Sequence, residues 1–155
     1  MKKKFLSLIA VLAVFALSAQ NHVPASKSMV GIWRQTGAMT SSGELVNVTT
    51  GIYKVINPDS TFYTFITWGA GGSNAPTEIG LYGTYKITSD STCTEHIVEH
   101  ATSPDMNGFD SFLKFKLVDE NTLMVQWKNG EKWIKESWSR LQMCKPKSRL
   151  GTPVV

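Results

Sequence analysis

Four side chains of this sequence could form a binding site. Glu136 and Arg140 stand four residues apart in one strand-like run, so both would lie on one face of an extended strand. Buried charge is costly unless it is paired, so an inward-facing Glu and Arg form either a satisfied structural network or a site that recognises a carboxylate. Glu95 lies in an earlier run of the same kind and could join them, and Trp68 precedes a glycine-rich stretch that could border a ligand.

Metal and catalytic chemistry have less support in the sequence. His96 and His100 are expected on one face of a strand, with Glu95 and Glu99 on the opposite face. Positions four residues apart on a strand are separated by about 13 Å, too far for one metal ion. No nucleophile motif, phosphate-binding loop or metal-ligand spacing accompanies these side chains. We therefore expect no metal, no cofactor and no catalytic residue, with an acid–base pair of Glu95 or Glu136 with His96 as the alternative.

The composition indicates one folded domain. The chain has 155 residues, of which 42% are hydrophobic and 18% charged, which is far from the composition of disordered chains. The formal net charge of +4 would suit a polyanionic partner. However, three of the 16 basic residues lie at positions 2–4 and three more follow residue 144. Residues 20–144 carry ten basic against twelve acidic residues, so we expect no nucleic-acid partner.

The N-terminal segment has the pattern of a secretory signal peptide. Residues 2–4 are lysines, the run 5–17 contains one polar residue, Ser7, and the small residues Ser18 and Ala19 follow. The apolar run is too short for a stable membrane span, so we expect cleavage after Ala19, with an uncleaved anchor as the alternative. No Cys follows the run for lipid attachment. The expectation is a soluble periplasmic or extracellular protein with no membrane span after cleavage.

Cys93 and Cys144 are the two cysteines of the chain. An oxidising compartment would permit one disulfide between them, and their spacing resembles neither a metal site nor a redox pair. The sequence is compatible both with a disulfide between the two cysteines and with two unpaired thiols.

From residue 29 onward the sequence predicts strands and almost no helix. Short runs rich in β-branched and aromatic residues are separated by clusters of Gly, Pro, Asn, Asp and Ser. In the clearest strand, 78–88, Ile79, Leu81 and Tyr85 would share one face. Asn129-Gly130 predicts a two-residue hairpin turn with positive φ at both positions. Eight strands are expected, at 29–36, 46–56, 61–68, 78–88, 92–101, 109–117, 122–128 and 131–141.

Eight antiparallel strands joined mostly by short turns predict an all-β fold, an eight-stranded antiparallel up-and-down barrel. Closure removes exposed edges and leaves an interior wide enough for side chains or one small ligand, whereas a sandwich is the alternative. The long connections 69–77 and 102–108 would lie at the same end and could surround a mouth. The expected organisation is a signal peptide at 1–19, a lead at 20–28, the barrel at 29–141 and a tail at 142–155.

Two short motifs stand on the first and last expected strands. They are Gly31-Ile32-Trp33 and Trp138-Ser139-Arg140. With eight strands between them, the chain resembles the calycin superfamily of lipocalins and fatty-acid-binding proteins. This resemblance implies that Arg140 packs across the ring of Trp33 at the closed end of the barrel, in a structural floor that includes Gly31 and Trp138.

Residues 29–141 are similar to small exported lipocalin-like domains of unknown function from bacteria. Gly83-Thr84-Tyr85-Lys86-Ile87 and Glu95 match the mid-barrel segment and the nearby Glu of those domains. The chain lacks the T-D-Y segment of classical lipocalins and the helix that follows their last strand. The resemblance to fatty-acid-binding proteins implies that Arg140 with Tyr85 holds the carboxylate of a ligand.

We expect an exported, non-enzymatic protein that binds a small apolar or amphipathic molecule inside the barrel. An envelope protein that contacts another macromolecule through its loops, around a filled barrel, is the second reading, and a small enzyme is the third. A cavity of about 300 Å³ or more would favour the first reading.

Overall fold

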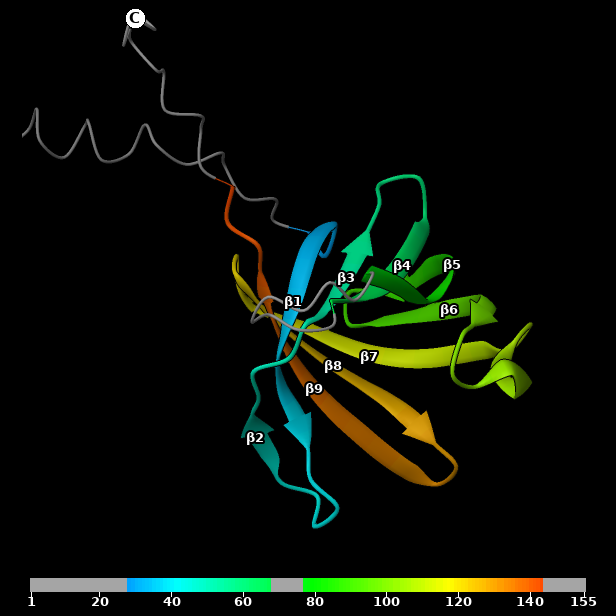
Figure 1. The fold of residues 1–155 in the computed structure, drawn as a ribbon. Helices are drawn as coiled ribbons and strands as arrows, with labels where there is room; N and C mark the ends of the chain where they lie inside the picture. Colours follow the sequence, from blue (N-terminus) through cyan, green and yellow to red (C-terminus); the bar gives the residue numbers. More distant parts are fainter. Residues whose placement is uncertain (1–27, 68–76, 144–155) are drawn as a thin grey trace, which may run out of the picture. The chain divides into compact units, whose positions relative to one another are not determined.

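The protein is described by a computed structural model that covers residues 28–67 and 77–143. These ranges are almost entirely β-structure (Figure 1). The elements are β1 (Gly31–Met39), β2 (Leu45–Asn47), β3 (Ile52–Ile56), β4 (Thr61–Thr67), β5 (Thr77–Ser89), β6 (Thr92–His100), the 3-10 helix η1 (Pro104–Met106), β7 (Asp110–Asp119), β8 (Thr122–Asn129) and β9 (Lys132–Arg140).

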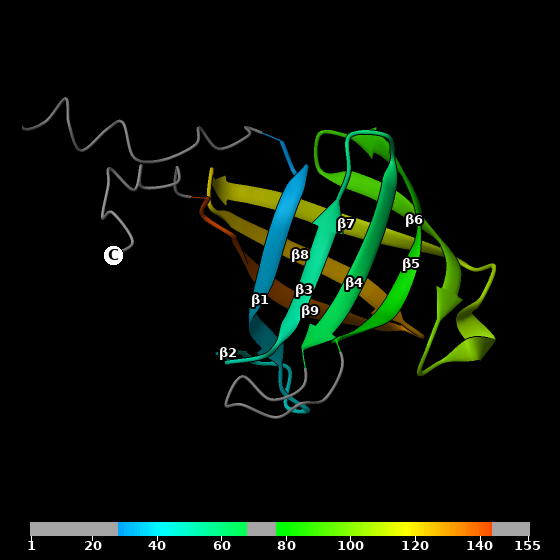
Figure 2. The same cartoon turned by 45° about the horizontal axis from the view of Figure 1, so that its top comes forward.

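Eight strands close a barrel in chain order. Each strand from β3 to β9 pairs antiparallel with the next, and β1 pairs antiparallel with both β3 and β9. Figure 2 shows β1, β3 and β4 crossing in front of β7, β8 and β9. Direct pairing of Trp33 with Arg140 joins the first strand to the last. The predicted eight-stranded antiparallel up-and-down barrel is confirmed, with β2 as one extra strand.

The prediction of one continuous strand over 46–56 is wrong. The segment forms β2 and β3, with residues 48–51 between them. β2 pairs with Gly37–Met39 at one end of β1, and β3 pairs with Gly31–Arg34 at the other. The same edge of β1 is therefore used twice, in the same direction, with a shift of register between the two pairings that residues 48–51 absorb. Alternation along the sequence does not report such a shift.

The other seven expected strands begin and end within three residues of the observed ones. The hairpin between β8 and β9 differs in detail, because Asn129 pairs with Lys132 and the turn consists of Gly130 and Glu131. Only Gly130, with φ of 59°, has positive φ at this turn. A turn with Gly first and positive φ there alone fits the twist of a hairpin equally well, so one glycine suffices.

Two bulges change which side chains face the interior. In β5 the pairing with β4 shifts at Gly80, so Leu81 faces inward whereas Ile79 is 57% exposed on the outside. In β6 the pairing with β5 shifts at Val98, between Ile97 and Glu99. An inserted residue reverses the alternation beyond it. The prediction that Ile79 shares a face with Leu81 is therefore wrong.

An apolar floor closes one end of the barrel. Its fully buried side chains Trp33, Leu123 and Cys93 pack in one cluster with Met29 and Trp138. The indole Nε1 of Trp33 donates a hydrogen bond to the carbonyl of Met29 (2.8 Å). Cζ of Arg140 lies 4.1 Å from the centroid of the Trp33 ring. The contact implied by the resemblance is thus present in the structure.

Arg140 also ties three segments of backbone together at this end. Its guanidinium donates to the carbonyl oxygens of Ser28 (2.6 Å), Val30 (2.6 Å) and Glu120 (2.7 Å). Gly31 has φ of 145°, and a side chain there would collide with Nη1 of Arg140. The glycine of the first motif therefore makes room for the arginine of the second.

Candidate functional site

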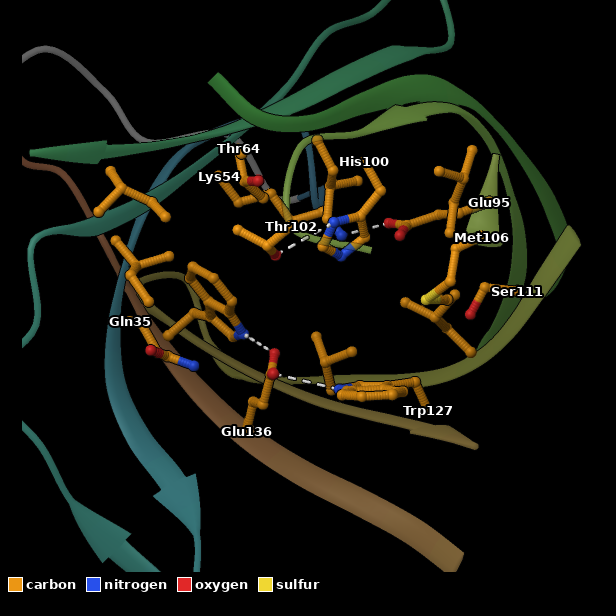
Figure 3. A pocket seen from close by; sticks show the side chains of 18 residues that line it. Gln35, Lys54, Thr64, Glu95, His100, Thr102, Met106, Ser111, Trp127 and Glu136 are labelled. Atoms are coloured by element: carbon orange, nitrogen blue, oxygen red, sulfur yellow. Dashed lines mark hydrogen bonds and ion pairs between the residues drawn. The ribbon is translucent and has the colours of Figure 1, made fainter. Parts of the chain in front are cut away.

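A cavity of about 260 Å³ lies inside the barrel, beyond the floor (Figure 3). Its apolar walls are formed by Ile52, Ile66, Leu81, Ile97, Met106, Leu113, Val125, Trp127 and Trp138, and its polar groups are Gln35, Lys54, Thr64, Glu95, His100, Thr102, Ser111 and Glu136. This volume does not reach the about 300 Å³ that would favour the small-molecule reading, and it lies just below the usual range of ligand sites. The cavity suits a small molecule rather than a long acyl chain.

Lys54 and Glu95 form an ion pair on one wall of the cavity. Nζ of Lys54 donates to Oε1 of Glu95, and both side chains are about nine-tenths buried. Nζ of Lys54 also lies 4.7 Å from the centroid of the Phe62 ring. A buried charge needs a partner of opposite sign, and each residue supplies it for the other. The ammonium of Lys54 is therefore already occupied by a carboxylate.

Glu136 on β9 is held by two tryptophans. Trp127 Nε1 donates to Oε1 of Glu136 and Trp138 Nε1 donates to Oε2, each at 3.1 Å. Burial raises the pKa of Glu136 above its ordinary value, and the two indole donors and the charge of Lys54 offset part of that rise. In the part of the chain that the structure describes, no Lys, Arg or His lies within ion-pair distance of Glu136.

His100 faces the cavity, contrary to the prediction that it shares a face with His96. The bulge at Val98 turns His100 inward opposite Leu81. His96 stays outside, where its Nδ1 lies 2.8 Å from Oδ1 of Asp110. Glu99 is also outside and accepts a hydrogen bond from the hydroxyl of Tyr82 (3.0 Å). The prediction that Glu95 and Glu99 share a face is wrong for the same reason.

The connection from β6 to β7 forms one border of the cavity. Met106 of η1 and Thr102 both line it, and in Figure 3 the side chains of Thr102 and His100 lie together. The backbone N–H of His100 donates to Oδ1 of Asn107 (2.8 Å), and the N–H of Gly108 donates to the carbonyl of Ile97 (2.7 Å). These bonds hold the connection against the end of β6.

The geometry can be compared with known proteins. A family model described as "Domain of unknown function (DUF4488)" matches residues 28–148. The chain belongs to this family. The DUF4488 match includes all nine strands that the structure describes, so the barrel and its cavity are parts of the DUF4488 domain. No curated protein matches the sequence.

In this DUF4488 domain, two residues nominated as a carboxylate-binding pair lie away from the cavity. The hydroxyl of Tyr85 donates to the carbonyl of Asn57 (2.7 Å), and Arg140 is used in the floor. Neither residue lines the cavity. Of the other nominated residues, Glu95, Glu136 and Trp138 line it. Trp68 lies outside the described residues.

Cys93 is a free, buried thiol on β6, and Cys144 lies outside the described residues. Burial, with the charge of Glu95, raises the pKa of the Cys93 thiol to about 11, and Lys54 offsets part of the rise. Within the described ranges, no group of three or more His, Cys, Asp or Glu side chains could hold a metal ion. Nor does any helix in these ranges have the length and apolar character to cross a membrane.

Lys54 is a charged residue of the site that sequence reasoning missed. It is flanked by Ile52 and Ile56 at alternate positions of an apolar strand, so its side chain had to face inward with theirs. A lysine among apolar residues on the inner face is a signal for a buried ion pair. Its partner, Glu95, is 41 residues away and could not be deduced from spacing.

Proposed function

We propose that this chain is an exported protein that binds a small amphipathic molecule inside its barrel and does not transform it. The observation that carries the proposal is the cavity of about 260 Å³, whose walls are mainly apolar but include a buried carboxyl held by two indoles. Apolar walls provide affinity without direction, and a few fixed polar groups orient the ligand. The resemblance to lipocalin-like domains supports the same role.

The polar groups of the cavity favour binding over catalysis. Lys54 and Glu95 are paired with each other, and the oxygens of Glu136 already accept two hydrogen bonds. Such groups are well placed to recognise a ligand, because their positions are fixed before it arrives. A catalytic role would require a proton donor or nucleophile aimed at a substrate, and we propose none.

Native mass spectrometry after mild purification from the exported fraction tests the binding proposal. The wild-type protein is expected to carry a bound small molecule. Ile66→Trp should abolish the bound mass, because Ile66 lines the cavity and the larger side chain would fill it. Phe65→Trp is the matched control, because Phe65 faces outward, where its ring stacks on Tyr53 at 4.9 Å.

Two outcomes would count against binding in the cavity. A bound mass that survives in Ile66→Trp would place the ligand elsewhere. A wild-type protein without any bound mass, which also stays empty when incubated with an extract of small molecules, would remove the proposed function.

Export is part of the proposal and rests on residues 1–19. The intact mass of protein recovered outside the cytoplasm should correspond to a chain that begins at Gln20. Recovery of exported protein that still begins with Met1 or Lys2 would contradict cleavage.

A further inference from the structure

The charges that line the cavity do not balance. Lys54 and Glu95 neutralise each other in their ion pair. Among the described residues, Glu136 is held by the neutral N–H groups of Trp127 and Trp138, and Lys54 acts on it through its charge without an ion-pair contact. The one lysine and the two glutamates of this lining, when ionised, therefore carry one net negative charge. Arg140, the other buried cation of the barrel, is engaged with the floor.

A buried carboxyl without a cation is costly for folding. Burial opposes the ionised form of Glu136, as its raised pKa indicates. A glutamine or a leucine at this place would avoid the cost. An ionisable side chain that lines a cavity, and whose burial destabilises its charged form, is typical of a functional site.

The geometry leaves room for a ligand on the same carboxyl. An ionised carboxylate offers about four acceptor sites, and the two indoles use one on each oxygen. The remaining sites can accept hydrogen bonds from an ammonium group, which carries donors only. Figure 3 shows Glu136 at the cavity wall, with Trp127 beside it and with His100 and Glu95 across the cavity.

We propose that the ligand of this cavity is a small organic cation, an amine with an apolar body, whose ammonium group pairs with Glu136. The inference rests on the proposed function and specifies its ligand class. The apolar body would lie against Ile97, Leu113 and Val125. An ammonium at Glu136 restores electroneutrality, because it supplies a cation that none of the residues in the described ranges places within ion-pair distance of this carboxyl.

The same arrangement disfavours a carboxylate ligand while Glu136 is ionised. The ammonium of Lys54 is paired with Glu95, and the guanidinium of Arg140 is bonded to three carbonyls in the floor. Neither cation is therefore free to pair with a ligand carboxylate. The negative charge of that ligand would instead be repelled by the ionised carboxylate of Glu136, and such repulsion is strong in a buried site. This is the opposite of the carboxylate grip that the resemblance to fatty-acid-binding proteins implies.

Three matched probes test the ligand class by isothermal titration calorimetry of the full chain. They are 2-phenylethylamine, 2-phenylethanol and phenylacetate, which share one ring and differ in the charge of the polar end. The amine is expected to bind at least about tenfold more tightly than the alcohol, and phenylacetate more weakly than both.

Glu136→Gln should weaken binding of the amine by about tenfold or more and change binding of the alcohol far less, because the charge is removed and the size of the side chain is kept. The amide oxygen can still accept from one of the two indoles. Glu99→Gln is the matched control, since Glu99 lies on the outside of the barrel and should not affect either probe. Thermal melting of both variants verifies that they are folded, and the wild-type probe series needs no variant at all.

The outcomes separate this inference from the proposed function. Phenylacetate that binds as tightly as the amine would overturn the amine assignment, and so would an amine affinity that Glu136→Gln leaves intact. Failure of all three probes would also overturn it. In each case the proposed function stands or falls separately, on whether native mass spectrometry finds a ligand that Ile66→Trp removes.

Discussion

The guanidinium of Arg140 on β9 lies over the ring of Trp33 on β1, with Cζ 4.1 Å from the ring centroid. The two residues are also direct partners in the pairing that closes the barrel. Arg140 is 9% exposed and Trp33 is fully buried, so the contact is shielded from water. The same side chain bonds three carbonyls, so the closure of the sheet and the closure of the floor depend on one residue.

Replacement of Arg140 should therefore destabilise the barrel. Arg140→Ala is expected to lower the free energy of unfolding by about 1 to 3 kcal/mol, because it removes the ring contact and leaves carbonyls without their donor. Urea denaturation followed by tryptophan fluorescence measures the loss. Arg34→Ala, on the exposed face of the same β1 strand, is the control and should cost much less. If the two substitutions lower the free energy of unfolding equally, then the contact of Arg140 with the floor does not stabilise the barrel.

The ion pair of Lys54 and Glu95 should behave as a buried pair. Glu95→Gln alone is expected to lower the free energy of unfolding by about 3 kcal/mol, because the ammonium of Lys54 is left in the interior without a carboxylate. The double variant Lys54→Met with Glu95→Gln should cost less than the sum of the single variants. A double-mutant cycle based on urea denaturation measures the coupling.

An exposed contact between a histidine and an aspartate in the same protein provides the comparison. His96 and Asp110 lie 2.8 Å apart with side chains that are 50% and 68% exposed. Asp110→Asn should cost less than about 1 kcal/mol, since solvent screens exposed pairs. If Glu95→Gln proves as mild as Asp110→Asn, then the pair on the cavity wall does not hold the interior together.

Glu136 should make the stability of the protein depend on pH. Its folded-state pKa is raised above the ordinary value of 4.5, so the folded state binds more protons than the unfolded state between these two pKa values. The free energy of unfolding should therefore fall as the pH rises from about 4.5 through the folded-state pKa, and stay level above it.

Glu136→Gln removes this titration and keeps the size of the side chain. In urea denaturation from pH 4 to pH 8 without ligand, the stability of the variant relative to the wild type should increase with pH. A relative stability that decreases with rising pH would mean that the carboxylate is favoured by folding, and would contradict the direction of the pKa shift.

The Cys93 thiol should be unreactive in the folded protein. With a pKa of about 11, about one thiol in a thousand is ionised at pH 8, and the side chain is fully buried. In Cys144→Ser, where Cys93 is the one remaining cysteine, alkylation by iodoacetamide should be at least about a hundredfold slower in buffer than in concentrated urea. Mass spectrometry follows the reaction, and similar rates in both solvents would show that β6 opens readily.

Residue types and their alternation were sufficient for much of the fold. Strand positions follow from runs of β-branched and aromatic residues, and closure follows from eight such runs joined by short turns. The floor contact was implied by the resemblance that the Gly and Trp at the start and the Arg at the end carry, and closure allows it because the first and last strands become neighbours. Strand positions and closure depend on local residue types and on the order of the strands along the chain. They can therefore be predicted without knowing the register of the strand pairs.

The composition of the site was decided by the tertiary structure. One inserted residue at Val98 moves His100 into the cavity, and a second irregularity at Gly80 moves Ile79 out of the interior. Strand alternation cannot reveal either shift, because a bulge becomes visible only when the partner strand is known.

The tertiary structure also decided which charged groups pair across the interior of the barrel. Glu136 and Arg140 share an inner strand face in the sequence, yet the floor takes the Arg and two indoles take the Glu. Lys54 meets Glu95 because the stagger of the closed sheet brings β3 and β6 to the same height in the barrel. The sequence by itself determined that charged groups would face inward. Only the closed structure decided that Glu136 accepts from two neutral indoles and has no cation within ion-pair distance among the described residues, whereas Arg140 belongs to the floor.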